Sequence, residues 1–165
     1  MSISLYDATV PVFARGFRVL SDLLTKAEAH ATDASALLEG RLAPDMLTLT
    51  GQIQRASDTA KFAVARLSEA QPPSFEDNEA SFADLRKRLD ATVAWIESVD
   101  RDAIEAGASR TIARTFRDTE YTFTGQSYVL TFALPNFFFH VTTAYDILRH
   151  QGVPIGKMDY LGVAG

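Results

Sequence analysis

The sequence contains no cysteine, and this absence excludes several kinds of chemistry at once. Disulfide bonds, thiolate nucleophiles and zinc sites with cysteine ligands all require the missing side chain. A chain without cysteine also fits the reducing environment of the cytosol. Any metal site or reaction centre must therefore be built from nitrogen and oxygen atoms.

Long apolar runs are missing as well. No window reaches the run of roughly 18 apolar residues that a membrane span requires, and the opening MSISLYDATVPVF lacks the basic region of a signal peptide. We therefore expect a cytoplasmic protein without a membrane partner. The net charge is −5, and the 16 Lys and Arg residues are dispersed instead of forming one phosphate-tracking face. Nucleic acid is not an expected partner either.

An apolar content of 47% in 165 residues is enough for one hydrophobic core, and we expect a single domain over residues 1–165. Three segments carry apolar residues at the three- and four-residue spacing of an amphipathic helix. These predicted helices run from Tyr6 to about His30, from Pro44 to about Glu69 and from Phe82 to about Ile96. Ser4 is the expected N-cap of the first helix. Alanines in the stripe of the second helix predict a closely packed partner.

The connecting segments have their own signals. Residues 70–81, AQPPSFEDNEAS, contain two prolines and indicate an exposed, extended link that is long enough to cross the bundle. A short helical turn is expected at Ser35–Glu39. In the third helix, residues 86–88 (Arg-Lys-Arg) fall largely outside the apolar stripe, so we expect them on a solvated face.

Between Asp100 and Gly125 the pattern changes, and the stretches SRTIARTF and EYTFT alternate with a period of two around the polar turn RDTE. Strands are expected from Arg110 to Thr124. This alternation predicts a small β-hairpin. A hairpin of two strands is only marginally stable alone, so one of its faces should press against the bundle. That face is expected to carry Ile112, Phe116, Tyr121 and Phe123.

The last predicted helix is the densest apolar segment of the chain. Thr124 is its expected N-cap, and Gly152 is expected just beyond its C-terminus. A helix that is apolar almost all round must be covered on more than one side. We therefore expect a homodimer in which a second copy covers part of it. Pro135 lies near its middle and, because proline lacks an amide, predicts a kink.

Asn136 and His140 follow Pro135 and share one face of this helix, because they are four residues apart. Three interpretations of His140 stay open at this point: a core histidine hydrogen-bonded to Asn136 or to a carbonyl freed by the proline, a residue of a pocket without metal, and a metal ligand. The other histidines, His30 and His150, lie close to helix C-termini. A partly charged imidazole is favourable there, so we predict structural roles for both.

Three stretches resemble a known family: SLYDATVPVFARGF near the start, RLAPDML before the second helix, and above all PNFFFHVTTAYDILRHQGVPIGKMDYLG. They are similar to an uncharacterised bacterial family of domains of unknown function in the DinB/YfiT-like superfamily. The resemblance covers nearly the whole chain. It implies a four-helix bundle, often dimeric. Many members of the superfamily bind a divalent metal through three histidines, two of them four residues apart on the last helix and the third on the second helix.

Placed on that pattern, His140 matches the second histidine of the pair and Asn136 stands where the first would be. No histidine lies between His30 and His140, so the resemblance leaves Gln52 as the nearest counterpart of the third. Amides are weaker ligands than imidazole for zinc, nickel or iron. The resemblance therefore implies Gln52, Asn136 and His140 as ligand-binding residues, without a metal or another cofactor.

The predicted fold class is mainly all-α, a DinB-like four-helix bundle with a small β-hairpin between the third and fourth helices. Our leading hypothesis is a protein that binds a small molecule in a pocket near His140 without a bound metal. One alternative is a divalent-metal-dependent transferase or hydrolase, since some superfamily members transfer thiol cofactors; it would need ligands such as His30, Asp45 or Asp146. The other alternative is a purely structural homodimer.

Overall fold

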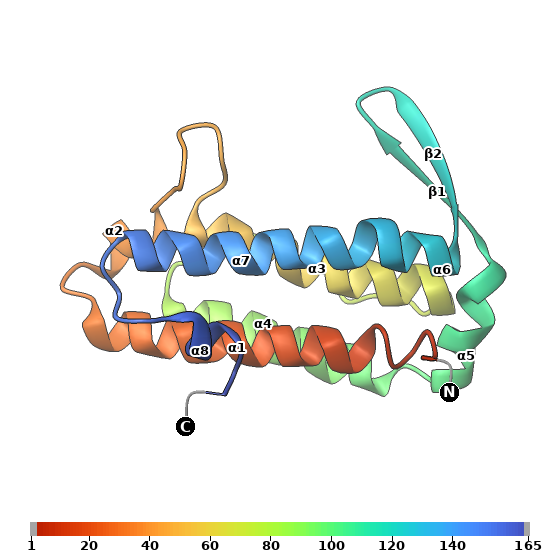
Figure 1. Cartoon of the computed structure of the whole chain (residues 1–165), viewed down its shortest axis with the longest axis horizontal. Helices are drawn as coiled ribbons and strands as arrows, with labels where there is room; N and C mark the ends of the chain where they lie inside the picture. Colours follow the sequence, from red (N-terminus) through yellow and green to blue (C-terminus); the bar gives the residue numbers. More distant parts are fainter. Residues whose placement is uncertain (1–2, 164–165) are drawn as a thin grey trace.

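The computed structural model describes residues 3–163 and confirms the mainly helical fold class, with a bundle of four long helices and one small hairpin (Figure 1). The elements are, in chain order, α1 (Val10–His30), α2 (Ala34–Leu38), α3 (Leu49–Ser68), α4 (Phe82–Ser98), α5 (Arg101–Ala106), the turn η1 (Gly107–Ser109), β1 (Thr111–Phe116), β2 (Thr119–Thr124), α6 (Gly125–Tyr128), the turn η2 (Val129–Ala133), α7 (Leu134–His150) and α8 (Lys157–Tyr160). No helix within residues 3–163 combines the length and the hydrophobicity that crossing a membrane would need.

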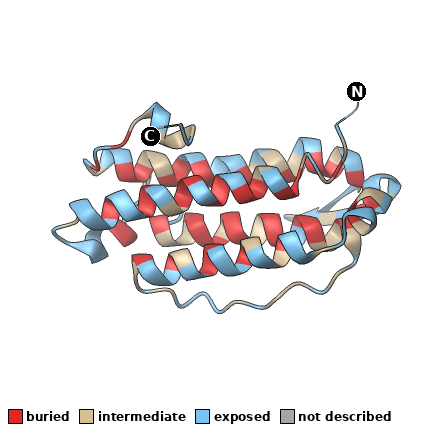
Figure 2. Ribbon diagram, turned by 90° about the horizontal axis from the view of Figure 1, so that it is seen from below, coloured by how far each residue is buried: buried red, intermediate tan, exposed pale blue. Residues whose placement is uncertain are grey.

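The core lies between α1, α3, α4 and α7, whose buried sides face one another (Figure 2). The ring of Phe137 on α7 is edge-on to Phe13 and Phe17 of α1, with centroids 4.9 and 5.2 Å away. Gly16 makes this approach possible, because a Cβ at that position would lie 2.5 Å from the Phe137 ring. The predicted alanine seam of α3 is also confirmed, since Ala56, Ala60 and Ala63 are fully buried.

The extended segment 69–81 carries the chain back along the bundle, so that α3 and α4 run in the same direction (Figures 1 and 2). The sequence predicted an extended link here, but not the ion pairs that attach it to α4. Arg88 on α4, expected on a solvated face, is only 4% exposed. Its guanidinium lies 2.9 Å from carboxylate oxygens of both Asp77 and Glu79 in the link. These ion pairs explain why a cation is buried on this face.

Two helices begin later than the sequence predicted. Ser4 does not cap α1; its hydroxyl accepts a hydrogen bond from the Asp7 amide in a preceding turn, and the helix begins at Val10. The helix predicted from Pro44 begins at Leu49, where the Thr48 hydroxyl accepts the Gly51 amide as an N-cap. In both places several neighbouring residues can begin a helix, and the helix begins a few residues after the predicted one.

The predicted hairpin is confirmed, but its turn is shorter than the predicted RDTE, because β2 already begins at Thr119. The short helix α5, within the segment where the pattern changes, was not predicted. Arg117 and Asp118 both have positive φ, as a two-residue hairpin turn requires, and Ile112 pairs with Phe123. Ile112 is buried and Phe123 is half-buried against the bundle. Tyr121 was expected to press on the bundle as well, but it is 49% exposed, because the hairpin leans away from the helices toward its tip (Figure 1).

The last helix accommodates Pro135 by a wider turn. Residues Val129–Ala133 form a π-helical turn, in which the Leu134 amide donates to the Val129 carbonyl five residues back. α6, η2 and α7 nevertheless form one continuous helical rod (Figure 1). A kink was expected at Pro135, whereas the rod continues through it and the irregularity is the π-helical turn that precedes the proline.

Candidate ligand-binding cleft

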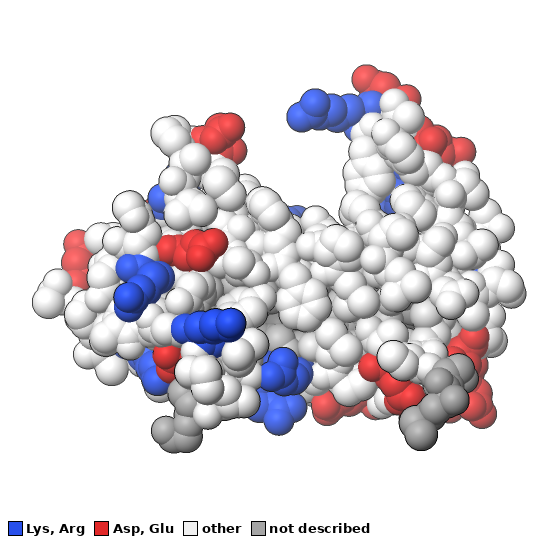
Figure 3. Space-filling model, in the orientation of Figure 1, with Lys and Arg blue, Asp and Glu red and all other residues white. Residues whose placement is uncertain are grey.

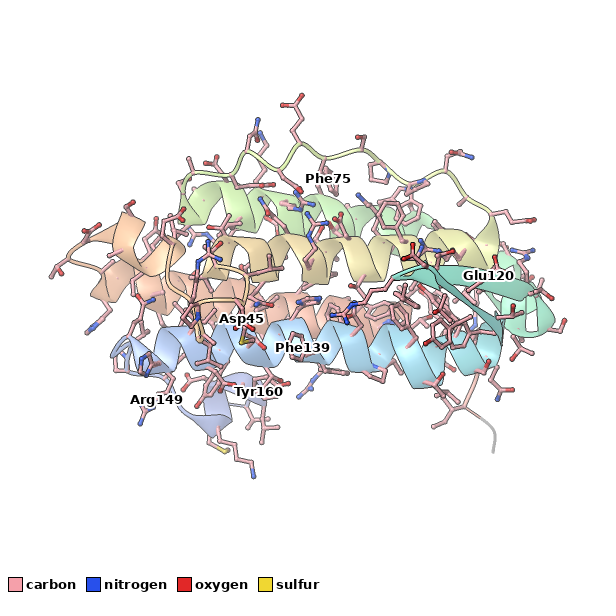
Figure 4. The ribbon with its side chains drawn as sticks, turned by 90° about the horizontal axis from the view of Figure 1, so that it is seen from above. Asp45, Phe75, Glu120, Phe139, Arg149 and Tyr160 are labelled. Atoms are coloured by element: carbon pink, nitrogen blue, oxygen red, sulfur yellow. The ribbon has the colours of Figure 1, made fainter. Side chains whose placement is uncertain are left out.

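A hollow lies on the outer surface of α3 and α7, between the hairpin and the loop of residues 41–48 (Figure 3). Beneath the hairpin it holds a cavity of about 320 Å³. Figure 4 views this side from above, with Glu120 marking the hairpin, Phe139 marking the middle of the last helix and Asp45 marking the loop. The cavity is lined by Arg55, Asp58, Thr59, Phe62, Arg66, Arg114, Tyr128, Phe132, Asn136 and His140.

A larger hollow of about 400 Å³ lies between α1 and α4. Its charged residues, Arg18, Asp22, Asp90 and Glu97, are all exposed to solvent. The cavity under the hairpin differs because it contains a buried histidine and half-buried arginines. Perturbed titratable groups in a concave site are the usual mark of function, so we place the candidate site there.

The wall formed by the last helical rod has a simple spacing: Tyr128, Phe132, Asn136 and His140 are each four residues apart. In a regular α-helix of about 3.6 residues per turn, positions four apart drift round the axis by about 40° per step. A π-helical turn is wider and drifts in the opposite direction. The turn at Val129–Ala133 therefore keeps all four side chains on the cavity.

His140 is 9% exposed, and its Nδ1 lies 2.8 Å from Oε1 of Gln52. The amide orientation of Gln52 is set by its Nε2, which donates to the Leu47 carbonyl at 3.3 Å. Because an amide oxygen only accepts hydrogen bonds, the imidazole carries its proton on Nδ1. The Nε2 atom is then left with a free lone pair.

The imidazole of His140 is neutral at physiological pH. Burial, together with the nearby positive charge of Arg55, lowers the pKa of His140 to about 4. Such a histidine can accept a hydrogen bond or a proton, but it does not carry a charge of its own at pH 7.

Asn136 is half-buried on the same wall. Its Nδ2 donates to the Thr59 hydroxyl at 2.7 Å, and that hydroxyl donates in turn to the Arg55 carbonyl at 2.7 Å. The carboxamide oxygen of Asn136 has no partner among residues 3–163. Like His140 Nε2, it is an acceptor.

The structure brings the three residues predicted from the sequence close together but gives them two different roles. Asn136 and His140 line the cavity, whereas Gln52 is 1% exposed and stands behind His140, where it orients the ring. The other histidines are elsewhere: His30 and His150 lie exposed in the last turns of α1 and α7.

The donor set around the cavity does not favour a metal. No cluster of three or more histidine, aspartate or glutamate side chains suited to a metal occurs in the described part of the chain. The carboxylate that lines the cavity, Asp58, is already paired with Arg55 at 3.0 Å and with Lys61 and Arg88 at 3.1 Å. His140 would therefore be joined by amide oxygens alone, a poor set for zinc, nickel or iron.

The arginines and most of the aromatic residues of the cavity were not predicted from the sequence. On α3, Arg55, Thr59, Phe62 and Arg66 form a second stripe beside the buried seam, at spacings of three and four. Arg114 lies between Ile112 and Phe116 in β1, two residues that were predicted to face the bundle. The period-two alternation therefore already placed Arg114 on the face toward the bundle. Both signals were present in the sequence.

A solved structure supports the placement of the chain in a family. A crystal structure of a DinB family member protein from Shewanella denitrificans is 40% identical in sequence, with a TM-score of 0.89 over 96% of this chain and 92% of that one. No curated protein matches the sequence. Residues 5–161 match the family described as "Domain of unknown function (DUF1993)". With this match over nearly its full length, the chain belongs to the DUF1993 family of DinB-like domains.

Proposed function

We propose that this protein binds a small organic molecule in the cleft at His140 and that it does so without a metal ion. The observation that carries the proposal is the state of His140: a neutral imidazole, held by Gln52, whose Nε2 has no hydrogen-bond partner among residues 3–163. This acceptor stands at the wall of the cavity in a fixed orientation, because the hydrogen bond to Gln52 holds the ring that carries it. A ligand hydroxyl or amine would satisfy it.

The shape and lining of the cleft agree with such a ligand. Its volume of about 320 Å³ lies in the range of small-molecule sites. Phe62, Tyr128 and Phe132 supply aromatic surface, and the polar groups are few and fixed. Tyr128 and Phe132 stack with their ring centroids 5.7 Å apart, which gives the cavity a rigid wall.

The alternative of a metal-dependent transferase or hydrolase meets two obstacles. Two of the three expected imidazoles are replaced by the amides of Gln52 and Asn136, and the Gln52 oxygen is engaged with His140 Nδ1. Asp58 is neutralised by three cations. A metal would have to displace one of these pairings before it gained a second strong ligand.

The experiment is an NMR titration of the ¹⁵N-labelled, tag-free protein with a fragment library in the presence of EDTA. We expect fragments to shift the His140 ring and the Asn136 side-chain amide, and to lose affinity in His140→Leu. His150→Gln removes an exposed histidine from the same helix and should leave binding intact. Fragments that bind only after zinc, nickel or manganese is added, or that bind without moving either signal, would overturn the proposal.

A specific observation also favours the homodimer, whether or not a ligand binds. Three large apolar side chains of the last helical rod are exposed: Leu130 by 55%, Phe138 by 38% and Phe139 by 53%. Exposed aromatic groups on one element are typical of an interface. Sedimentation equilibrium should give twice the chain mass of 18.1 kDa, with a shift toward monomer in Phe139→Ser. A monomer at all concentrations would contradict this role.

A further inference from the structure

The cavity contains two arginines whose charge is not balanced by the protein. Arg66 comes from α3 and Arg114 from β1, and both line the same cavity. Neither forms an ion pair with a carboxylate within residues 3–163; Arg66 donates instead to the Tyr128 hydroxyl at 3.1 Å. Two unpaired cations at one site are unusual in a protein whose net charge is −5.

Arg114 also has a buried donor without an acceptor. Its Nε is inaccessible to solvent and has no hydrogen-bond partner in the described structure. Burial and the neighbouring charge of Arg66 both lower the pKa of Arg114, so the two guanidinium groups repel each other across the cavity. An anion between the two would accept from both guanidinium groups.

Aromatic rings hold the two guanidinium groups in place. The Arg66 guanidinium lies 5.3 Å from the ring centroid of Phe62 and 5.9 Å from that of Tyr128, and the Arg114 group lies 5.6 Å from that of Phe116. Such stacking leaves the N–H edges of a guanidinium free. Those edges match the oxygens of a carboxylate or a phosphate, to which arginine can donate two parallel hydrogen bonds.

We propose that Arg66 and Arg114 bind the anionic group of the ligand, a carboxylate or a phosphate, at the hairpin end of the cleft. This inference rests on the proposed function and specifies its ligand. Phe132 contacts the body of the molecule, while Asn136 and His140, both acceptors, receive its hydroxyl or amino hydrogens. The chemical class is an organic acid or phosphate ester that carries a hydrogen-bond donor at its other end.

The test is calorimetry with three probes of similar size: phenyl phosphate, benzoate and the neutral benzamide. We expect phenyl phosphate and benzoate to bind at millimolar concentration and benzamide to bind at least about tenfold more weakly. Arg66→Gln and Arg114→Gln should each weaken the anions by about tenfold or more. Arg117→Gln removes the same charge from the turn of the same hairpin, outside the cavity, and should change affinity by less than about twofold. Phenyl phosphate against benzoate distinguishes a phosphate site from a carboxylate site.

The outcomes separate this inference from the function on which it rests. Benzamide binding as tightly as benzoate, with the same affinity in Arg114→Gln, would overturn the anion site and leave a ligand cleft at His140. Loss of anion binding in Arg117→Gln as large as in Arg114→Gln would overturn it as well, because the effect would then be one of net charge. If neither anion binds the parent protein, the anion site is wrong, and the fragment titration with His140→Leu decides the proposed function by itself.

Discussion

Two sets of arginines in this molecule have opposite surroundings. The side chain of Arg88 is 2% exposed, and it is paired with Asp58, Asp77 and Glu79 at 2.9 to 3.1 Å. Arg66 and Arg114 are half-buried under the hairpin, without a carboxylate partner among residues 3–163. The first arrangement ties the segment 69–81 to α3 and α4. The second leaves positive charge for something that is not part of the chain.

The energetic consequences of the two arrangements differ. Removing one member of a buried ion-pair network strands the opposite charges, and this is strongly destabilising. Removing a cation that has no partner takes away repulsion as well as packing, so the folded state loses little. Charged groups that cost stability in this way are typical of binding sites, where stability is exchanged for function.

The largest effect is expected for Arg88→Leu. The substitution leaves the buried carboxylate of Glu79 without its ion-pair partner and takes one cation each from Asp58 and Asp77. We expect a loss of about 3 kcal/mol in the free energy of unfolding. Urea denaturation followed by circular dichroism measures it. Arg101→Ala, which breaks the exposed pair with Asp7, is the control and should cost about 0.5 kcal/mol. A loss below about 1 kcal/mol in Arg88→Leu would mean that the network does not hold the link.

His140 should make stability depend on pH. Its pKa is about 4 in the folded protein and 6.5 as the ordinary value. Because the unfolded chain takes up the proton first, the contribution is fully present above pH 6.5 and is lost as the pH falls toward 4. The full pKa shift corresponds to about 3 kcal/mol in the free energy of unfolding. We expect a loss of about 2 kcal/mol, because water reaches the cleft and screens the charge.

Comparison of the parent with His140→Leu isolates this effect. Urea midpoints at pH 7 and pH 4 should show a smaller acid-induced loss in the variant, by about 2 kcal/mol. The carboxyl groups of Asp77 and Glu79, whose pKa values are lowered by hydrogen bonds from Arg88 in spite of burial, add an acid-induced loss to both proteins equally. Parallel losses in parent and variant would show that His140 titrates as an exposed histidine does.

The smallest effect is expected for Arg114→Gln and Arg66→Gln. Neither substitution strands a carboxylate, and relief of repulsion offsets the lost packing, so stability should stay within about 0.5 kcal/mol of the parent. Thermal and urea unfolding check this prediction. A loss of about 2 kcal/mol or more for either variant would place the arginines in the same structural class as Arg88 and remove the contrast between the two sets.

The parts of this structure that local pattern controls were predictable from sequence. The alternation around RDTE located both strands of the hairpin, and the alanines of α3 identified its packed seam. The helix starts at Val10 and Leu49 were not predicted, because several nearby residues can cap a helix and tertiary contacts choose among them.

Long-range features of the site were less accessible. The burial of Arg88 depends on carboxylates that the crossing segment brings to it, and nothing in the α4 stripe shows this. The relation between Gln52 and His140 entered through family resemblance, and the structure added its chemistry: a hydrogen bond that fixes the tautomer of the ring. The spacing of Tyr128, Phe132, Asn136 and His140 was visible, but the π-helical turn that keeps them on one wall was not.

The most direct test of the account is a crystal structure of the tag-free protein, purified with EDTA and soaked with phenyl phosphate. We expect the phosphate between the guanidinium groups of Arg66 and Arg114, the phenyl ring against Phe132, and the His140–Gln52 hydrogen bond unchanged. The same soak in Arg114→Gln should show the phosphate at a much lower occupancy, as an affinity weaker by about tenfold requires. Phosphate bound elsewhere on the surface, or a ring of His140 turned away from Gln52, would contradict the central claim that this cleft is a metal-free site for an anionic small molecule.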